Sequence, residues 1–418
     1  MKRVLLVAYY FPPLASAGTF RALRLAKYLP RAGWDVTVLS VTPKVRLLKD
    51  PALERDIPET VPVLRTPTLE PRNALLALHR VGLGGVAHRI EPWFMTPDDQ
   101  RGWVPFARAA ARRAHAATPF DAVITTSAPY SAHLVGLAMR RDGLPWLADF
   151  RDEWTTNPFV SARFPTGWHR RLNAELEQTV IRTADRVASV SGPCLAGLRR
   201  GSPDAPDAKF VELPNGFDAE HFAGPARGRP DRFRIAYTGI FYGHRAPHAF
   251  LDGLARVVGD GRVPRAEVEV NFAGHTASSR DVSGPLLAGV TVCGHLSQER
   301  SIELMRDAAV LLLVLGREEG GPGIYTSKLF HYLAAGRPIL AIVPSDGVAA
   351  DLVRRSRAGV VVPPDDPDAI AEAIALLYRQ WRGEGEPFDP DPAVIAPFEA
   401  RRQTADWARV LDAIAAPR

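Results

Sequence analysis

The chain has 418 residues, of which 46 % are hydrophobic and 23 % are charged, and its formal net charge is +6. This length exceeds what one ordinary core needs, so two domains are expected, and the composition is that of a soluble globular protein. Cys194 and Cys293 belong to no CxxC or Cys/His cluster, which argues against a disulfide framework and a zinc site and fits a reducing compartment. No apolar run reaches the ~18–20 residues of a membrane span.

The first residues have two interpretations. Basic Lys2 and Arg3, the apolar run 4–11 and the small residues 15–17 together resemble a short secretory signal with its cleavage site. Two prolines interrupt the run, however, and an amphipathic helical pattern follows directly after it. A buried strand, a loop and a helix are therefore favoured over a signal peptide.

The first half of the chain alternates apolar runs with helical patterns. Continuous apolar runs are typical of strands that are covered on both faces of a parallel sheet. Helices between such strands indicate βαβ units. The predicted strands are 4–10, 35–39, 121–125, 145–148 and 186–190, and the predicted helices are 20–29 and 131–141.

A second series begins after a polar linker at 225–230. Its predicted strands are 233–237, 268–272, 290–292, 310–314, 339–342 and 359–362, separated by predicted helices 298–306, 325–335 and 367–378. A last amphipathic helix is predicted over 397–414. The chain is thus predicted to be α/β, with two Rossmann-like doubly wound domains and ligands bound at the carboxyl ends of the strands.

Residues 65–105 are the least regular stretch. An apolar segment at 74–90 contains interspersed histidine and arginine residues, and Trp93 and Phe94 follow it. It is either a helix pair that covers the sheet or an element that contacts a membrane or covers an acceptor.

Positive charge is concentrated in the first half. Residues 1–225 hold 29 Lys+Arg against 22 Asp+Glu, whereas residues 226–418 hold 23 against 24. The densest part comprises Arg108, Arg112, Arg113, Arg140 and Arg141. These form either a solvated surface or a patch that attracts anionic lipid or a phosphate-bearing acceptor. Nucleic acid is not expected as a partner, because no recognition motif accompanies the charge.

The loop 12–19 leads from the first strand into a helix and is rich in small residues, including Gly18. Small residues let the backbone approach a ligand, and a helix N-terminus attracts anions. The loop has neither GxGxxG nor GxxxxGK[ST], so it is not the dinucleotide fingerprint or a P-loop.

Two cations stand out in the second half. Gly239 ends a predicted strand and Arg245 follows six residues later, while Lys328 ends a glycine-rich approach to a helix. Lys328 is the only lysine after residue 209, and an ammonium is not equivalent to a guanidinium. Arg245 and Lys328 are either pyrophosphate ligands that stabilise a leaving nucleotide or ordinary surface cations.

Polar residues also follow strands of the first half. His133 is near the start of a predicted helix, and Asp149, Arg151 and Asp152 follow the next strand. All should lie at strand carboxyl ends. His133 is either a packed or capping residue or a ligand contact. Asp149, Arg151 and Asp152 form either an internal ion pair or a site that recognises the acceptor.

Five stretches, in this order, resemble the family 4 retaining glycosyltransferases. They are YYFPPLASAGTFRALRLAKYL, TTSAPYSAHLVGLAMRRDGLPWLADFRDEW, LPNGFD, YTGIFYGHRAP and YTSKLFHYLAAGRPILA. The resemblance runs over nearly the whole chain and implies a GT-B fold, with two domains facing across a cleft. It implies an acceptor-binding domain at 1–218, a nucleotide-sugar domain at 219–396 and a helix at 397–418 that returns to the first domain. It also implies an enzyme that requires no metal ion or other cofactor. The cysteine usage favours a cytoplasmic location, and the basic N-terminal domain is either free of the membrane or in peripheral contact with its inner face.

The resemblance assigns roles by position. Gly18 would contact the donor through its backbone, Arg245 and Lys328 would bind the pyrophosphate, and His133 would bind the transferred sugar near the reacting carbon. The base would lie near His295 and Leu296, and the pyrophosphate and ribose near Leu329 and Phe330. The leaving phosphate would help to deprotonate the acceptor on the same face, so no protein nucleophile is implied.

The chain departs from the family pattern at two positions. The family's E-x7-E pattern would place glutamates at Gly323 and His331, and the second of these binds the ribose hydroxyls. The favoured hypothesis is a hexosyltransferase that acts on a glycan, a polyprenyl-linked intermediate or a small molecule. The alternatives are a nucleotide-sugar 2-epimerase and a non-catalytic GT-B binding protein.

Overall fold

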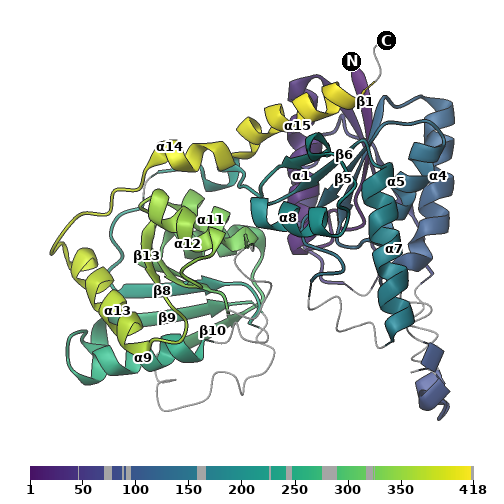
Figure 1. The fold of residues 1–418 in the computed structure, drawn as a ribbon. Helices are drawn as coiled ribbons and strands as arrows, with labels where there is room; N and C mark the ends of the chain where they lie inside the picture. The colour runs from purple at the N-terminus through teal and green to yellow at the C-terminus, as the bar shows by residue number, and fades with distance from the viewer. Residues whose placement is uncertain are drawn as a thin grey trace. The chain divides into compact units, whose positions relative to one another are not determined.

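The computed structural model describes residues 1–45, 47–69, 78–86, 89–90, 96–157, 166–225, 227–241, 247–274, 290–316, 323 and 325–415. The chain forms two compact units (Figure 1). The first unit comprises Met1–Pro214 together with Arg401–Arg418, and the second comprises Asn215–Ala400. The final helix therefore belongs to the unit that the start of the chain forms.

The first unit contains a parallel sheet in the order β3-β2-β1-β4-β5-β6-β7. Its strands are β1 (Lys2–Val7), β2 (Trp34–Val41), β3 (Val63–Thr66), β4 (Ala122–Ser127), β5 (Trp146–Phe150), β6 (Arg186–Ser189) and β7 (Phe210–Glu212). Its helices are α1 (Ala17–Tyr28), α4 (Val104–Ala117), α5 (Ser131–Arg141), α7 (Gly167–Thr183), α8 (Gly192–Arg200) and α15 (Ala400–Ile414).

Both faces of this sheet are buried. Leu5 and Val7 of β1 pack with α4 and α5, whereas Val4 and Leu6 pack on the other face with α1 and α15. Because successive strand side chains point to opposite faces, a strand that is covered on both sides reads as a continuous apolar run. The opening apolar segment of the sequence is therefore the strand β1, as favoured above.

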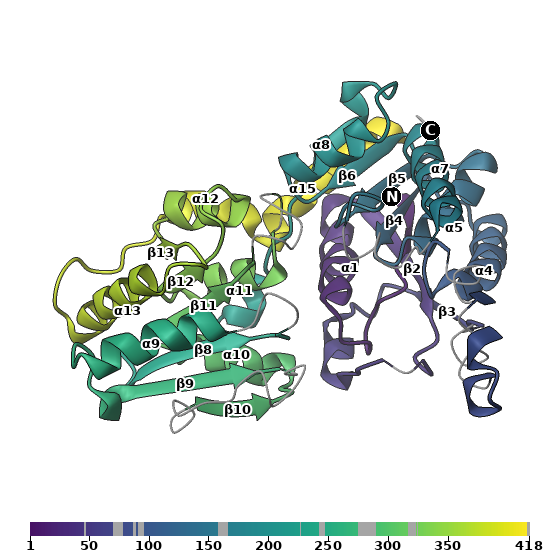
Figure 2. The same cartoon turned by 60° about the horizontal axis from the view of Figure 1, so that its bottom comes forward.

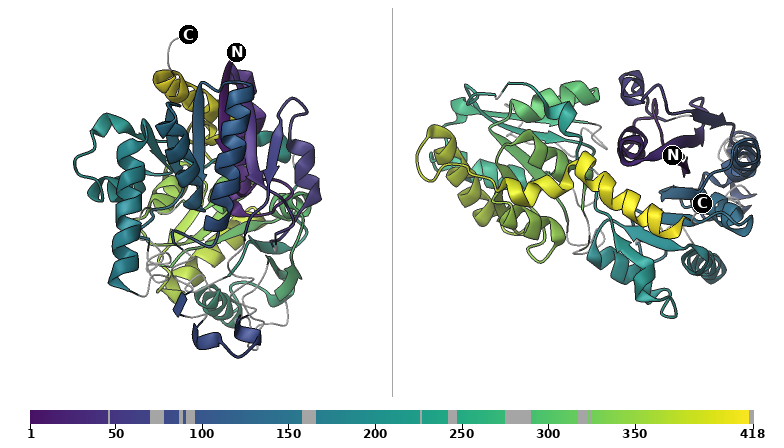
Figure 3. Two further views of the ribbon diagram at one scale, coloured as in Figure 1. Left: turned by 90° about the vertical axis from the view of Figure 1, so that its right-hand side faces the viewer. Right: turned by 90° about the horizontal axis from the view of Figure 1, so that it is seen from above.

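Helix α15 returns to the sheet beside the start of the chain. Trp407 and Leu411 are buried in the core that contains Val4 and Leu6. Lys2 donates to the Asp412 carboxylate at 2.8 Å, so the two ends of the chain lie side by side (Figure 3).

The second unit contains a parallel sheet in the order β10-β9-β8-β11-β12-β13. Its strands are β8 (Phe233–Thr238), β9 (Val268–Ala273), β10 (Val290–Gly294), β11 (Val310–Val314), β12 (Ile339–Ile342) and β13 (Gly359–Val362). Its helices are α9 (His248–Gly259), α10 (Gln298–Arg306), α11 (Ser327–Ala335), α12 (Val348–Arg355), α13 (Pro367–Arg382) and the short α14 (Pro392–Ile395). Helices α9 and α13 cover one face, and α10, α11 and α12 cover the other (Figure 2).

The prediction of two doubly wound α/β domains is confirmed. In the part of the chain that the structure describes, no helix is long and apolar enough to cross a bilayer. Residues 74–77 and 87–88 of the irregular segment 74–90 lie outside the described residues, as do Trp93 and Phe94.

Candidate functional site

The strand orders locate one candidate site in each unit. β1 lies between β2 and β4, and β8 lies between β9 and β11, so the winding of each sheet reverses at its first strand. Ligands of open α/β sheets bind beyond the carboxyl ends of the strands at this reversal. The residues that follow β1, β4 and β5, and those that follow β8 and β11, are therefore the candidates.

His133 is a buried imidazole beyond β4. It lies in the first turn of α5, and its Nδ1 lies 2.7 Å from the Thr125 hydroxyl near the end of that strand. Its ring centre lies 4.3 Å from that of Phe150, at the end of β5. Burial lowers the pKa of His133 to about 3; Asp149 opposes this shift and Arg151 adds to it. The imidazole is therefore neutral at physiological pH.

The second ring nitrogen of His133 is unsatisfied. Nε2 is buried and has no hydrogen-bond partner among the residues that the structure describes. A buried polar atom without a partner costs about 1–3 kcal/mol, so one that persists beside a strand end indicates a place for a ligand atom. This observation favours ligand contact over packing alone as the role of His133.

Gly18 and Arg151 are brought together. Gly18 is in the first turn of α1, and a Cβ placed on it would lie 2.7 Å from Nη2 of Arg151. The guanidinium also donates to the carbonyls of Ser127 and Ala128, the latter at 2.7 Å. Burial lowers the pKa of Arg151, while Asp152 and Asp149 oppose the shift. The lack of a side chain at Gly18 therefore lets a cation lie against the first turn of α1.

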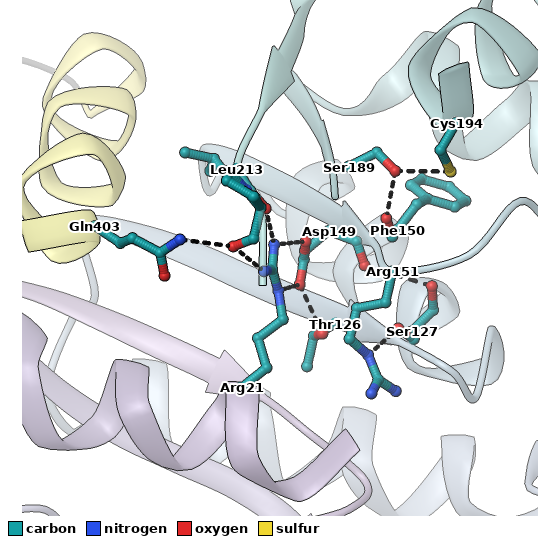
Figure 4. Close-up of polar contacts among 11 residues, drawn as sticks. Arg21, Thr126, Ser127, Asp149, Phe150, Arg151, Ser189, Cys194, Leu213 and Gln403 are labelled. Carbon is teal, nitrogen blue, oxygen red and sulfur yellow. Dashed lines mark hydrogen bonds and ion pairs between the residues drawn. The ribbon is translucent and has the colours of Figure 1, made fainter. Parts of the chain in front are cut away.

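Asp149 forms a buried ion pair (Figure 4). Arg21 of α1 donates to both of its carboxylate oxygens, at 2.7 and 2.9 Å, and Thr126 donates to one of them at 2.7 Å. Arg21 also donates to the carbonyls of Leu213 and Pro214. These contacts support the internal ion-pair interpretation for Asp149 rather than direct contact with an acceptor.

Asp152 differs from Asp149 in its surroundings. Its side chain is exposed, two residues beyond the end of β5. Of the three residues predicted to bind the acceptor, Arg151 and Asp152 are thus the two that are not committed to the Arg21 pair.

In the second unit, Gly239 and Lys328 meet at the carboxyl end of β8. A Cβ on Gly239 would lie 2.2 Å from Cε of Lys328, and the φ angle of Gly239 is +135°, which favours glycine. The Lys328 ammonium donates to the Tyr237 hydroxyl at 2.9 Å and lies 4.7 Å from the centre of that ring. Gly239 and Lys328, each predicted to bind the donor, therefore lie side by side, and Tyr237 is an additional contact that the sequence analysis missed.

The N-terminus of α11 is not capped by its own side chain. Thr326 is the N-cap residue, but its buried hydroxyl has no hydrogen-bond partner in the described part of the chain. The first turn of the helix carries Lys328 and no acidic residue. The positive end of the helix dipole and an ammonium together favour an anion such as a phosphate.

Leu329 and Phe330 lie in the first turn of α11, with their side chains turned into the core. Both side chains are fully buried in the core on the α11 face of the second sheet. Any contact with a donor must therefore come from their backbone. The buried Tyr332, one turn further on, accepts from the Thr238 amide at 3.0 Å and so fixes α11 against the end of β8. Its role was not predicted.

The other predicted residues are more scattered. His295 and Leu296 follow β10, the edge strand, which lies two places from β8. His331 is half-buried on α11, with its ring centre 6.0 Å from that of Phe222. Arg245 lies outside the described residues. Within the described ranges, no cluster of three or more His, Cys, Asp or Glu residues could hold a metal ion.

The sequence matches two family models. Residues 17–216 match the "Glycosyl transferase 4-like domain" and residues 232–380 match "Glycosyl transferases group 1". A phosphatidyl-myo-inositol mannosyltransferase of Mycobacterium tuberculosis is 29 % identical over 226 residues. That match spans 52 % of this chain and 56 % of the mannosyltransferase, or about half of each protein.

Solved structures share the fold over the whole chain. Sucrose-phosphate synthase from Thermosynechococcus elongatus superposes with a TM-score of 0.59 at 17 % identity, over 99 % of this chain and 95 % of that one. Anabaena HepE in complex with UDP-glucose superposes with a TM-score of 0.62 at 14 % identity, over 99 % of this chain and 100 % of that one. The trehalose-phosphate synthase of Burkholderia xenovorans superposes with a TM-score of 0.61 at 12 % identity, over 99 % of this chain and 100 % of that one. The two domain matches show that the chain belongs to the family 4 glycosyltransferases, and the fold that it shares with these structures is of the GT-B type, as its motifs predicted.

Proposed function

We propose that this glycosyltransferase moves a hexose, with retention of anomeric configuration, from a nucleoside-diphosphate sugar to a hydroxyl-bearing acceptor. The bond from the anomeric carbon to the β-phosphate oxygen breaks, and a bond to the acceptor oxygen forms on the same face. The acceptor proton passes to the leaving phosphate, so the products are a glycoside and a nucleoside diphosphate. The retaining course rests on the family resemblance.

The start of α11 is the observation that carries the donor assignment. The diphosphate leaves with growing negative charge, and fixed positive groups that face it lower the barrier to transfer. The Lys328 ammonium and the positive end of the α11 dipole, beside the unpartnered Thr326 hydroxyl, are such groups. These groups supply positive charge without a metal ion, so we propose that none is required.

The unpartnered Nε2 of His133 supports a contact with the transferred sugar in the first unit. A neutral imidazole can hydrogen-bond a sugar hydroxyl without introducing a charge near the reacting carbon. The mannosyltransferase and UDP-glucose relatives are the reason to expect a hexose in the donor.

The acceptor is proposed only by class, as a glycan, a lipid-linked intermediate or a small molecule. Part of the basic cluster is neutralised: Arg112 pairs with Asp142, and Arg140 pairs with Asp185. These pairs favour the solvated-surface interpretation over lipid attraction. Cytoplasmic location and peripheral membrane contact remain part of this proposal, and sedimentation with anionic against neutral vesicles tests the contact.

The experiment is nucleotide release from a panel of UDP-, GDP- and dTDP-hexoses, with and without EDTA. Wild type is compared with Lys328→Ala, with His331→Glu and with Arg256→Ala, which removes an exposed cation that pairs with Asp368 elsewhere in the second unit. Removal of the charge at Lys328 should cost about 2 kcal/mol or more of transition-state stabilisation, or roughly thirtyfold in rate. Arg256→Ala should match wild type, and EDTA should change nothing.

Three outcomes would contradict the proposal. Equal release by Lys328→Ala and wild type would remove Lys328 from the donor site. A new sugar nucleotide in place of a free diphosphate would indicate an epimerase. No release and no calorimetric binding of any nucleotide would favour a non-catalytic protein.

A further inference from the structure

We propose that Thr125 is a positioning residue that holds His133 as the Nε2–H tautomer, and that Trp146 favours this tautomer by donating to the same hydroxyl. The inference deepens the proposed function and rests on it, because it states which hydrogen-bonding group His133 offers to the sugar. Thr125, Trp146 and His133 come from β4, β5 and α5 respectively.

The assignment follows from counting protons around one buried oxygen. Thr125 is fully buried, and its hydroxyl has two partners: the Trp146 indole Nε1 at 2.8 Å and His133 Nδ1 at 2.7 Å. An indole nitrogen can only donate, so the hydroxyl accepts from Trp146. The single hydroxyl proton is then available for His133 Nδ1, which must be the unprotonated nitrogen to accept it.

The opposite tautomer leaves more groups unsatisfied. If His133 Nδ1 carried the proton, the Thr125 hydroxyl would accept from both neighbours, and its own proton would have no acceptor among the residues described. The buried Nε2 would then also lack a partner. The Nε2–H tautomer leaves one unpartnered group, and the alternative leaves two. Each unsatisfied buried group costs about 1–3 kcal/mol, which decides between the tautomers.

A glycine lets these three side chains meet. Gly136 is one turn after His133 on α5, and a Cβ there would lie 2.3 Å from the Trp146 ring and 2.7 Å from Cγ2 of Thr125. Helix α5 can therefore approach the sheet closely enough for His133 to reach the Thr125 hydroxyl. The same approach places the indole N–H beneath that hydroxyl.

His133 therefore offers the sugar a fixed hydrogen-bond donor rather than an acceptor. The free nitrogen of His133 presents an N–H, so it recognises an oxygen lone pair of the sugar. Since burial also keeps the ring neutral, this donor carries no charge in the physiological pH range. A ring free to change tautomer would present the donor for only part of the time.

The test is a direct reading of the tautomer. Long-range 1H–15N correlation spectra of 15N-histidine protein distinguish protonated from unprotonated ring nitrogens, and loss of signals in His133→Phe assigns the ring. We expect wild type and Thr125→Ser to show Nε2–H. Thr125→Val, which keeps the side-chain shape, should show a mixture. Thr37→Val changes another buried strand threonine of this unit and should match wild type.

The turnover number of the same variants is the second measurement. Thr125→Val should lower kcat about tenfold, the equivalent of one hydrogen bond, with little change in nucleotide binding. Thr125→Ser should restore the rate. An Nδ1–H signal in wild type, or an unchanged tautomer in folded Thr125→Val, would overturn the inference. If the tautomer behaves as expected but no sugar is transferred, the proposed function fails and the assignment stands.

Discussion

The buried imidazole of His133 makes the stability of the first unit depend on pH. Its pKa is about 3 in the folded chain and near 6.5 when unfolded. Between these values the unfolded chain binds a proton that the folded chain does not. The titration of His133 therefore does not change the free energy of unfolding above about pH 6.5, and it lowers that free energy as the pH falls from there towards 3.

We expect His133→Phe to remove this dependence. Between pH 6 and 4.5, the free energy of unfolding of wild type should fall more steeply than that of the variant, by at most about 1.4 kcal/mol per pH unit. Urea denaturation at several pH values, followed in the first unit, measures the two slopes. Parallel slopes would mean that the ring is protonated in the folded chain.

The sequence pointed to His133 and Gly239 through their places at predicted strand ends and through the family resemblance. It pointed to Lys328 because this is the only lysine after residue 209. It did not point to Thr125 or Thr326. Buried hydroxyl residues are frequent in strands and caps, and their importance here depends on partners that only the folded chain supplies.

At the scale of elements, the contact between β8 and α11 needs a glycine. Gly239→Ala should clash with Lys328 and strain a positive φ angle, whereas Gly261→Ala strains φ (+76°) with no neighbour within 4 Å. Both variants should lose about 1–2 kcal/mol of stability. Only Gly239→Ala should weaken nucleotide binding, by roughly tenfold or more, as measured by calorimetry. Equal binding by the two variants would show that Lys328 does not depend on this close approach.

Periodicity predicted several strands and one helix with the correct bounds. The expected strands 310–314, 339–342 and 359–362 coincide with β11, β12 and β13, and helix 131–141 coincides with α5. Long, apolar segments carry a strong signal. The edge strand β7 has three residues and no apolar alternation, and α7 carries few apolar residues, so neither was predicted.

At the scale of the whole chain, the first unit is completed by α15. Trp407 is 3 % exposed, and Arg21 lies 4.8 Å from the centre of its ring. Trp407→Ala should lower the stability of the first unit by about 3–5 kcal/mol. Trp168→Ala, at a side chain that is 48 % exposed, should cost less than about 1 kcal/mol.

Amide hydrogen exchange locates the effect of Trp407→Ala. Protection should fall in β1 and β4, while β8 and β11 of the second unit keep theirs. A uniform loss of protection in both sheets would show that α15 does not stabilise the first unit selectively.

The return of α15 to the first sheet also determines the order in which the two units can complete their folding. The ribosome releases β1 before α15, but part of the apolar face around Val4 and Leu6 is covered by Trp407 and Leu411 of α15. All of Asn215–Ala400 is synthesised in between. The unit that is made first is therefore completed last, and during translation its uncovered face is available to chaperones or to aggregation.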